Sequence, residues 1–188
     1  MSEANLKIGR LPSELESAAS DAFSRLAIAD SASWRTVGGQ PTSIQIFNLA
    51  SVVLFTDHVA KLEGLADSGA AMEATRFPHL PWWQTSVWLP VTFQPPKDPA
   101  IDMGGWPVFL GSCQGLLADL AEVQKLSDMT LGTTPDGYDA MRCDLRAWLR
   151  SGFELSDERA IIQWVWKGLH ESAEIAVRTG SALLLDMS

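Results

Sequence analysis

A chain of 188 residues is long enough to build one domain with a substantial buried core. Hydrophobic residues make up 46% of it and charged residues 20%, which is typical of a globular protein and excludes a largely disordered one. The net charge of −9 at pH 7 repels phosphate backbones and anionic lipid headgroups, so it argues against a nucleic-acid or membrane partner. We therefore expect a single domain over residues 1–188, and the charge favours a basic protein as its partner.

Location and cofactors are constrained mainly by what the sequence lacks. Residues 1–10 contain no apolar run of the kind found in signal peptides, and the longest apolar stretch is too short to span a bilayer. The two cysteines, Cys113 and Cys143, are too few for a disulfide framework or a thiolate metal cluster. The pair His170 and Glu174, four residues apart, is too small a set to predict a metal site. These features predict a cytoplasmic protein without a metal or other cofactor, and they leave its oligomeric state open.

In the first part of the chain, apolar spacing predicts helices. Residues 12–29 begin with Pro12, which suits the first position of a helix, and carry one apolar stripe at helical spacing. Residues 43–66 are apolar over so much of the circumference that they predict a central helix of a bundle. A short helix is expected at residues 70–75.

Residues 77–107 differ in kind from the rest of the chain. They contain seven of the ten prolines and four of the eight tryptophans. Proline interrupts helices, so we expect an irregular excursion there, with one edge strand at residues 85–93 broken at Pro90. Long irregular segments inside compact domains are often functional.

Helices are expected again in the last part of the chain. Ser112 is a good N-cap for a helix that ends near residue 126. Residues 134–151 begin with a strong helix start, and residues 156–180 carry a long apolar stripe. The predicted fold is therefore mainly α, a bundle of five to six helices with one long Pro/Trp-rich irregular or short β excursion.

The five residues Gly111-Ser112-Cys113-Gln114-Gly115 lie between an apolar run and a helix. They resemble the nucleophile elbow of cysteine α/β-hydrolases and class I glutamine amidotransferases, which read Gly-x-Cys-x-Gly. The resemblance implies that Cys113 is a nucleophile activated at a helix N-terminus, with His170 as its base. It also implies a parallel sheet with several βα units, and the long helices expected upstream depart from that pattern. The other reading is an N-cap at Ser112 followed by a small buried thiol.

Aromatic residues of the proline-rich segment form a second candidate site. Rigid aromatic side chains bind partners at low entropic cost, and they are enriched at protein interfaces. The candidate binding residues are Trp82, Trp83, Trp88, Phe93 and Trp106. The competing interpretation is that these side chains fold back and cover the helical core.

Two functions from different classes follow. The favoured hypothesis is a non-enzymatic protein-binding module, similar in general character to immunity and inhibitor proteins that bind a basic partner protein. The alternative is a cysteine-dependent hydrolase or amidotransferase that uses Cys113 and His170. A lesser possibility is a small apolar ligand held between the helices and the aromatic segment.

Overall fold

The computed structural model describes residues 3–26, 33–35, 38–82, 84–96, 101–103, 105–128 and 158–187. In chain order these residues form β1 (Glu3–Gly9), α1 (Ser13–Leu26), the 3-10 turn η1 (Ser33–Arg35), β2 (Thr42–Asn48), α2 (Leu49–Leu62), α3 (Ser68–Ala74), β3 (Ser86–Leu89), β4 (Ile101–Asp102), β5 (Pro107–Ser112), α4 (Cys113–Leu126), α7 (Glu158–Thr179) and β6 (Ala182–Asp186). The helix predicted at residues 134–151 lies outside this part of the chain.

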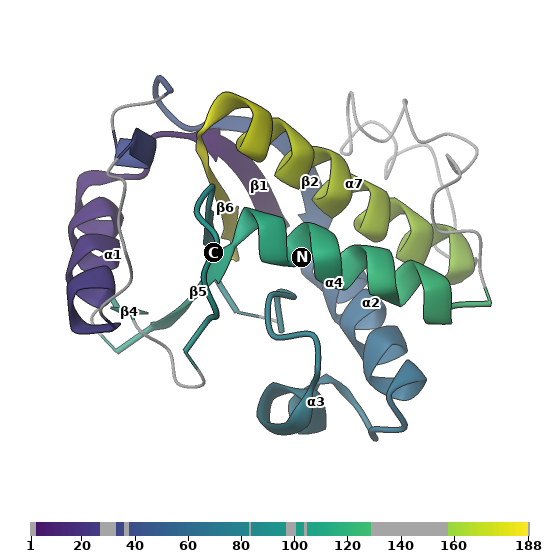
Figure 1. Ribbon diagram of the computed structural model, residues 1–188. Coiled ribbons are helices and arrows are strands. Elements are labelled where there is room, and N and C mark those ends of the chain that lie inside the picture. The colour runs from purple at the N-terminus through teal and green to yellow at the C-terminus, as the bar shows by residue number, and fades with distance from the viewer. Residues whose placement is uncertain are drawn as a thin grey trace.

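The expectation of a mainly α bundle is wrong, because the described residues contain a six-stranded mixed sheet. The strand order is β2-β1-β6-β3-β5-β4. β3 and β5 are parallel, whereas the other neighbouring strands pair antiparallel. Figure 1 shows α1 on one side of the sheet and α2, α4 and α7 on the other. The fold is therefore a mixed α/β architecture with helices on both faces.

Strand β6 is buried on both faces of the sheet, and this burial made it hard to predict from its sequence. Leu183 and Leu185 join the core beneath α2, α4 and α7, whereas Ala182 and Leu184 join the core beneath α1. A strand buried on both faces reads as a continuous apolar run without alternation. β6 is not apparent from the sequence for this reason. β1 was also missed, although it alternates polar and apolar residues from Glu3 to Ile8.

The long helix expected at residues 43–66 is in fact a strand followed by a helix. Residues 42–48 form β2, which pairs antiparallel with β1 from Glu3 opposite Asn48 to Ile8 opposite Thr42. The helix α2 begins only at Leu49. Pairing with β1, about forty residues away in the chain, fixes the extended conformation of β2. The local spacing of apolar residues cannot predict such a distant contact.

The proline-rich segment 77–107 contributes strands to the sheet rather than an excursion. Strand β3 lies between β6 and β5, so the prediction of an edge strand is wrong. The strand ends at Leu89, immediately before Pro90, whose missing amide hydrogen cannot extend the ladder. The short strand β4 forms the edge beyond β5.

Four of the predicted helices are confirmed, as α1, α3, α4 and α7. Ser112 caps α4 as expected, since its hydroxyl oxygen accepts a hydrogen bond from the Gly115 amide at 3.2 Å. Among the described helices, none has both the length and the apolar character that crossing a bilayer requires. The single-domain organisation over residues 1–188 stays a prediction.

Candidate functional site

The cysteine turn has the strand–turn–helix setting that its sequence predicts, but its thiol is inaccessible. β5 ends at Ser112 and α4 begins at Cys113. Cys113 is fully buried, and this burial raises the pKa of its thiol far above the ordinary range. Because the thiolate is the nucleophilic form, a buried protonated thiol is a poor nucleophile.

The histidine that contacts this turn is His79, not the predicted His170. His170 lies on α7, where its ring stacks on Trp166 with ring centroids 4.8 Å apart. In contrast, Nδ1 of His79 accepts a hydrogen bond from the Ser112 amide at 3.1 Å. The His79 ring also lies directly against Gly115, since a Cβ added there would come within 2.2 Å of its Nε2 atom.

His79 ties its loop to three elements of the fold. Its backbone amide donates to Oδ2 of Asp119 on α4 at 2.8 Å, and its carbonyl oxygen accepts from Nε1 of Trp88 on β3 at 2.7 Å. Burial lowers the pKa of His79 to about 4. Burial also raises the pKa of Asp119 to about 7, although the hydrogen bond from the His79 amide opposes this and the charge of Glu63 adds to it. The arrangement fits a structural role for His79.

The two shifted groups have opposite effects on stability between about pH 4 and pH 6.5. The folded state binds fewer protons at His79 than the unfolded chain does, so stability is lost there as the pH falls from 6.5 to about 4. The folded state binds more protons at Asp119, so stability is gained there as the pH falls from about 7 to 3.8. We expect Asp119→Asn to remove the stability gained at Asp119 as the pH falls. The stability lost at His79 is then no longer offset. The free energy of unfolding is measured by urea denaturation at pH 6.5 and at pH 4. Between these two pH values, the variant should lose up to about 3 kcal/mol more than the unmodified chain does.

Glu122→Gln provides the matched control for that measurement. Glu122 is a half-exposed acid on the same helix, paired with Lys125 at 3.1 Å. Its variant should keep the pH profile of the unmodified chain. If Asp119→Asn also kept that profile, the proposed offset between the two buried groups would be wrong.

Within the proline-rich segment, three of the predicted binding residues are part of the core. Trp82, Trp88 and Phe93 are 4%, 0% and 9% exposed. Trp83 lies outside the described residues. Trp106 is 77% exposed, so it is the member of the predicted set that a partner can reach directly in the described part of the chain.

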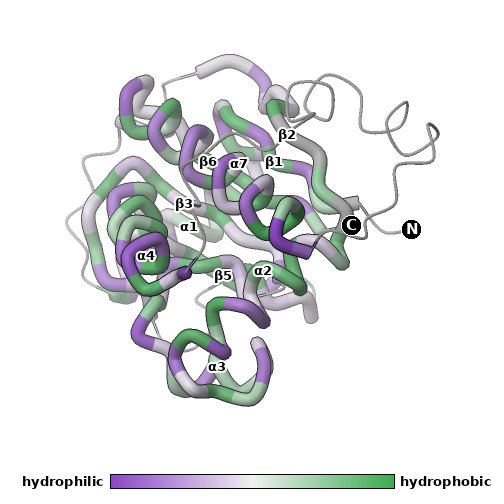
Figure 2. Tube along the Cα trace, turned by 90° about the vertical axis from the view of Figure 1, so that its right-hand side faces the viewer, coloured by the Kyte–Doolittle hydropathy of each residue, from purple (hydrophilic) through white to green (hydrophobic). Residues whose placement is uncertain are grey.

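Four carboxylates gather where α2 meets α3 and the loop that follows, and we call them the acidic corner: Asp57, Glu63, Asp67 and Glu73. Residues 57–74 carry these four acids against one lysine, Lys61. Figures 1 and 2 both show α3 at the lower end of the molecule, projecting away from the sheet. The acidic corner therefore occupies a prominent end of the molecule.

Backbone amides hold two of these carboxylates in place. Oδ1 of Asp57 accepts from the Ser68 amide at 2.8 Å. Oδ1 of Asp67 accepts from the Ala70 amide at 2.9 Å and caps α3. A neutral amide fixes the position of a carboxylate without cancelling its charge.

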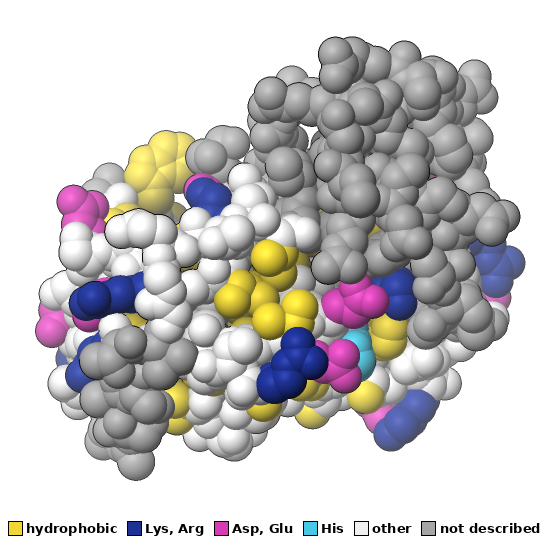
Figure 3. All heavy atoms as spheres, turned by 90° about the horizontal axis from the view of Figure 1, so that it is seen from above, with side chains coloured by type: hydrophobic (Ala, Val, Ile, Leu, Met, Phe, Trp, Pro, Cys, Tyr) yellow, Lys and Arg dark blue, Asp and Glu magenta, His cyan; other side chains and the backbone are white. Residues whose placement is uncertain are grey.

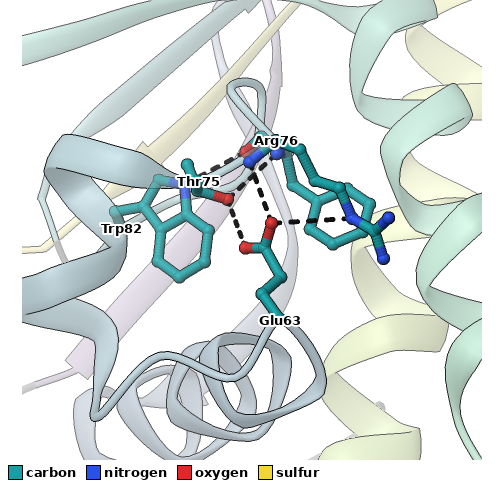
Figure 4. Close-up of polar contacts among 5 residues, drawn as sticks. Glu63, Thr75, Arg76 and Trp82 are labelled. Atoms are coloured by element: carbon teal, nitrogen blue, oxygen red, sulfur yellow. Dashed lines mark hydrogen bonds and ion pairs between the residues drawn. The ribbon is translucent and has the colours of Figure 1, made fainter.

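Glu63 is anchored most firmly of the four. Its Oε2 atom accepts from the Thr75 hydroxyl at 2.6 Å, and its Oε1 atom accepts from the Arg76 amide at 2.9 Å, as Figure 4 shows. The Arg76 guanidinium also lies 3.6 Å from Oε1. The Trp82 indole closes this loop by donating to the Phe77 carbonyl at 3.1 Å. Glu63 thus holds the loop, while the exposed Asp67 and Glu73 carry the outward charge.

Several acidic side chains elsewhere on the described surface pair with basic residues. The face in Figure 3 shows Asp and Glu side chains lying beside Lys and Arg. The ion pairs away from the corner include Glu16 with Arg10, Glu171 with Lys167 and Asp186 with Lys7. The corner was not predicted from the sequence, where the negative charge was considered only for the chain as a whole. The available signal was the local excess of acid over residues 57–74.

A pocket of about 500 Å³ opens beside the acidic corner. Its apolar wall includes Pro78, Trp82, Pro95 and Pro96. Polar side chains also line it, namely Glu73, Thr75, Gln84 and Gln94. Glu73 therefore belongs to both the corner and the pocket.

Comparison with known proteins gave one family. A family model described as “Putative DNA-mimic protein” matches residues 53–185, which is more than two thirds of the chain. No curated protein and no solved structure matches the chain. The matched residues include most of α2, all of α3 and α4, and the acidic corner, and they leave out β1, α1 and β2.

Proposed function

Because the chain belongs to the DNA-mimic protein family, we propose that it binds the DNA-contacting surface of a DNA-binding protein in place of DNA. A protein that binds DNA gains much of its affinity by neutralising phosphates with lysine and arginine. Carboxylates at the acidic corner offer the same charge to such a surface. The net charge of −9 supports this proposal through long-range attraction.

The family assignment corrects the functions expected from the sequence. The immunity- or inhibitor-type module that binds a basic partner protein is wrong, because the family is one of DNA mimics. The partner is thereby narrowed from any basic protein to a DNA-binding protein. The cysteine-dependent hydrolase or amidotransferase is wrong as well, and the buried Cys113 thiol gives the physical reason.

The observation that carries the proposal is the way the acidic corner holds its charge. Backbone amides fix Asp57 and Asp67, so these carboxylates need less ordering when a partner binds. The phosphates of DNA are likewise negative charges that are held in fixed positions by a neutral framework. The proposal keeps the expected cytoplasmic location and the expected lack of direct binding to nucleic acid.

The test is displacement of proteins from DNA. Proteins of the source cell are loaded on immobilised duplex DNA, and the purified chain is added at a physiological salt concentration. We expect release of at least one DNA-binding protein, identified by mass spectrometry, while the chain itself stays unbound to the DNA. Release of no DNA-binding protein, or binding of the chain to the DNA, would contradict the proposed function.

The acidic corner is tested with the protein released in that experiment and a fluorescent duplex. The double variant Asp67→Asn/Glu73→Gln should need about tenfold more protein for half-displacement, because two exposed charge pairs are lost. The matched control Glu14→Gln/Asp21→Asn removes the same charge from the exposed face of α1, outside the residues that the family model matches. It should stay within about twofold of the unmodified chain. Equal losses in both variants would show that net charge alone acts and would remove the corner from the proposal.

A further inference from the structure

We infer that the pocket beside the acidic corner receives an arginine side chain of the DNA-binding partner. The inference rests on the proposed function and names the chemistry that the partner must present at this site. DNA-binding proteins commonly insert arginine into a narrow groove where the negative potential is strongest. The pocket combines negative charge with close walls in the same way.

Size and lining both fit this occupant. A volume of about 500 Å³ lies within the range of about 300–1,000 Å³ in which binding pockets fall. It leaves room for the side chain together with the backbone that carries it. The walls include Pro78, Pro95 and Pro96, whose apolar rings can pack against the aliphatic stem of arginine.

The polar groups of the pocket are suited to a donor-rich cation. Arginine carries five N–H donors and no acceptor. Glu73, Gln84 and Gln94 line the same space, and each of their side chains carries an acceptor oxygen. Glu73 is exposed, and in the described part of the chain no cation pairs with it. The Glu73 carboxylate would repel an anion, so the pocket is not suited to phosphate.

The neighbouring loop already holds a guanidinium by the same chemistry. Arg76 lies 5.1 Å above the ring of Phe77, and its Nε atom is 3.6 Å from Glu63. An aromatic face and a carboxylate thus flank this internal arginine. In the pocket, Glu73 supplies the carboxylate for an external arginine, and the largely buried Trp82 forms part of the apolar wall.

The pocket and the corner form one continuous surface. Glu73 lines the pocket, and Thr75 links the pocket to Glu63 through its hydroxyl hydrogen bond. A basic segment with one arginine in the pocket therefore places its other cations near Asp67 on the same helix. Arginine is favoured over lysine because its planar guanidinium offers five N–H donors to the acceptors of the pocket, whereas the ammonium group is compact and strongly hydrated.

The experiment is an NMR titration of the ¹⁵N-labelled full chain with N-acetyl-arginine methylamide. We expect shifts in the side-chain amide signals of Gln84 and Gln94, with weaker shifts for the lysine analogue at equal concentration. Glu73→Gln should weaken arginine binding by up to about fivefold, the effect of one exposed charge pair. The control Glu14→Gln makes the same change on α1 and should bind as the unmodified chain does.

Each outcome decides the inference. Equal shifts with arginine and lysine, equal loss in both variants, or no shift at the two glutamines would overturn it. Failure of the proposed function is seen separately, in the DNA displacement assay. Arginine binding without displacement would contradict the function alone, and displacement without arginine binding would contradict the pocket alone.

Discussion

Replacing Trp88 with alanine is expected to lower the free energy of unfolding by about 3–5 kcal/mol, the usual cost of removing a buried tryptophan side chain. Trp88 is fully buried in the interior strand β3. Its indole donates to the His79 carbonyl at 2.7 Å, and its ring meets Phe109 edge-on at 6.3 Å between centroids. The substitution leaves a cavity and removes the hydrogen-bond donor from a buried carbonyl oxygen. Urea denaturation followed by circular dichroism measures the loss.

Trp106→Ala is the control from the same proline-rich segment. Trp106 is 77% exposed, so its replacement should change stability by no more than about 0.5 kcal/mol. A small effect of Trp88→Ala would contradict the tight packing of Trp88 in the interior of the sheet. A large effect of Trp106→Ala would mean that the exposed indole packs against part of the fold.

A Gly115→Ala variant is expected to lower the free energy of unfolding by about 2–4 kcal/mol. Alanine normally stabilises a helix by about 1 kcal/mol relative to glycine, so the expected sign is the reverse of the helical preference. The added Cβ would meet the His79 ring at 2.2–2.4 Å. That ring cannot move cheaply, because Nδ1 of His79 is bonded to the Ser112 amide and its backbone is bonded to Asp119 and Trp88.

Gly39→Ala makes the same chemical change where there is space. A Cβ at Gly39 meets no atom within 4 Å, so stability should stay within about 0.5 kcal/mol. The measurement is again the urea midpoint, with tryptophan fluorescence as a second probe. If Gly115→Ala were as stable as the Gly39 variant, the close contact between His79 and α4 would be wrong.

Local patterns were sufficient to predict most helices but not the sheet. The apolar stripe of α7 and the cap of α4 at Ser112 are local features, and both elements lie where they were expected. β1, β2 and β6 depend on contacts between residues far apart in the chain, such as Asn5 with Asp186. β2 was read as the start of α2 because its apolar side chains also fit helical spacing.

The candidate site was predictable only in part. The cysteine turn was found, yet its buried partner His79 was not, because nothing near residue 113 indicates that a loop packs over it. The aromatic residues were recognised as unusual, and burial now separates Trp88 from Trp106. The acidic corner was missed because the local excess of acid over residues 57–74 was not considered apart from the net charge of the chain.

The position of β6 has a consequence for how the protein is made. β6 is synthesised after the other five described strands, yet it lies between β1 and β3. Until residues 182–186 leave the ribosome, β2-β1 and β3-β5-β4 remain two separate pieces with unpaired edges. Exposed edges of this kind pair readily with other chains. We therefore expect the sheet of the described residues to be completed late, when β6 pairs with both β1 and β3.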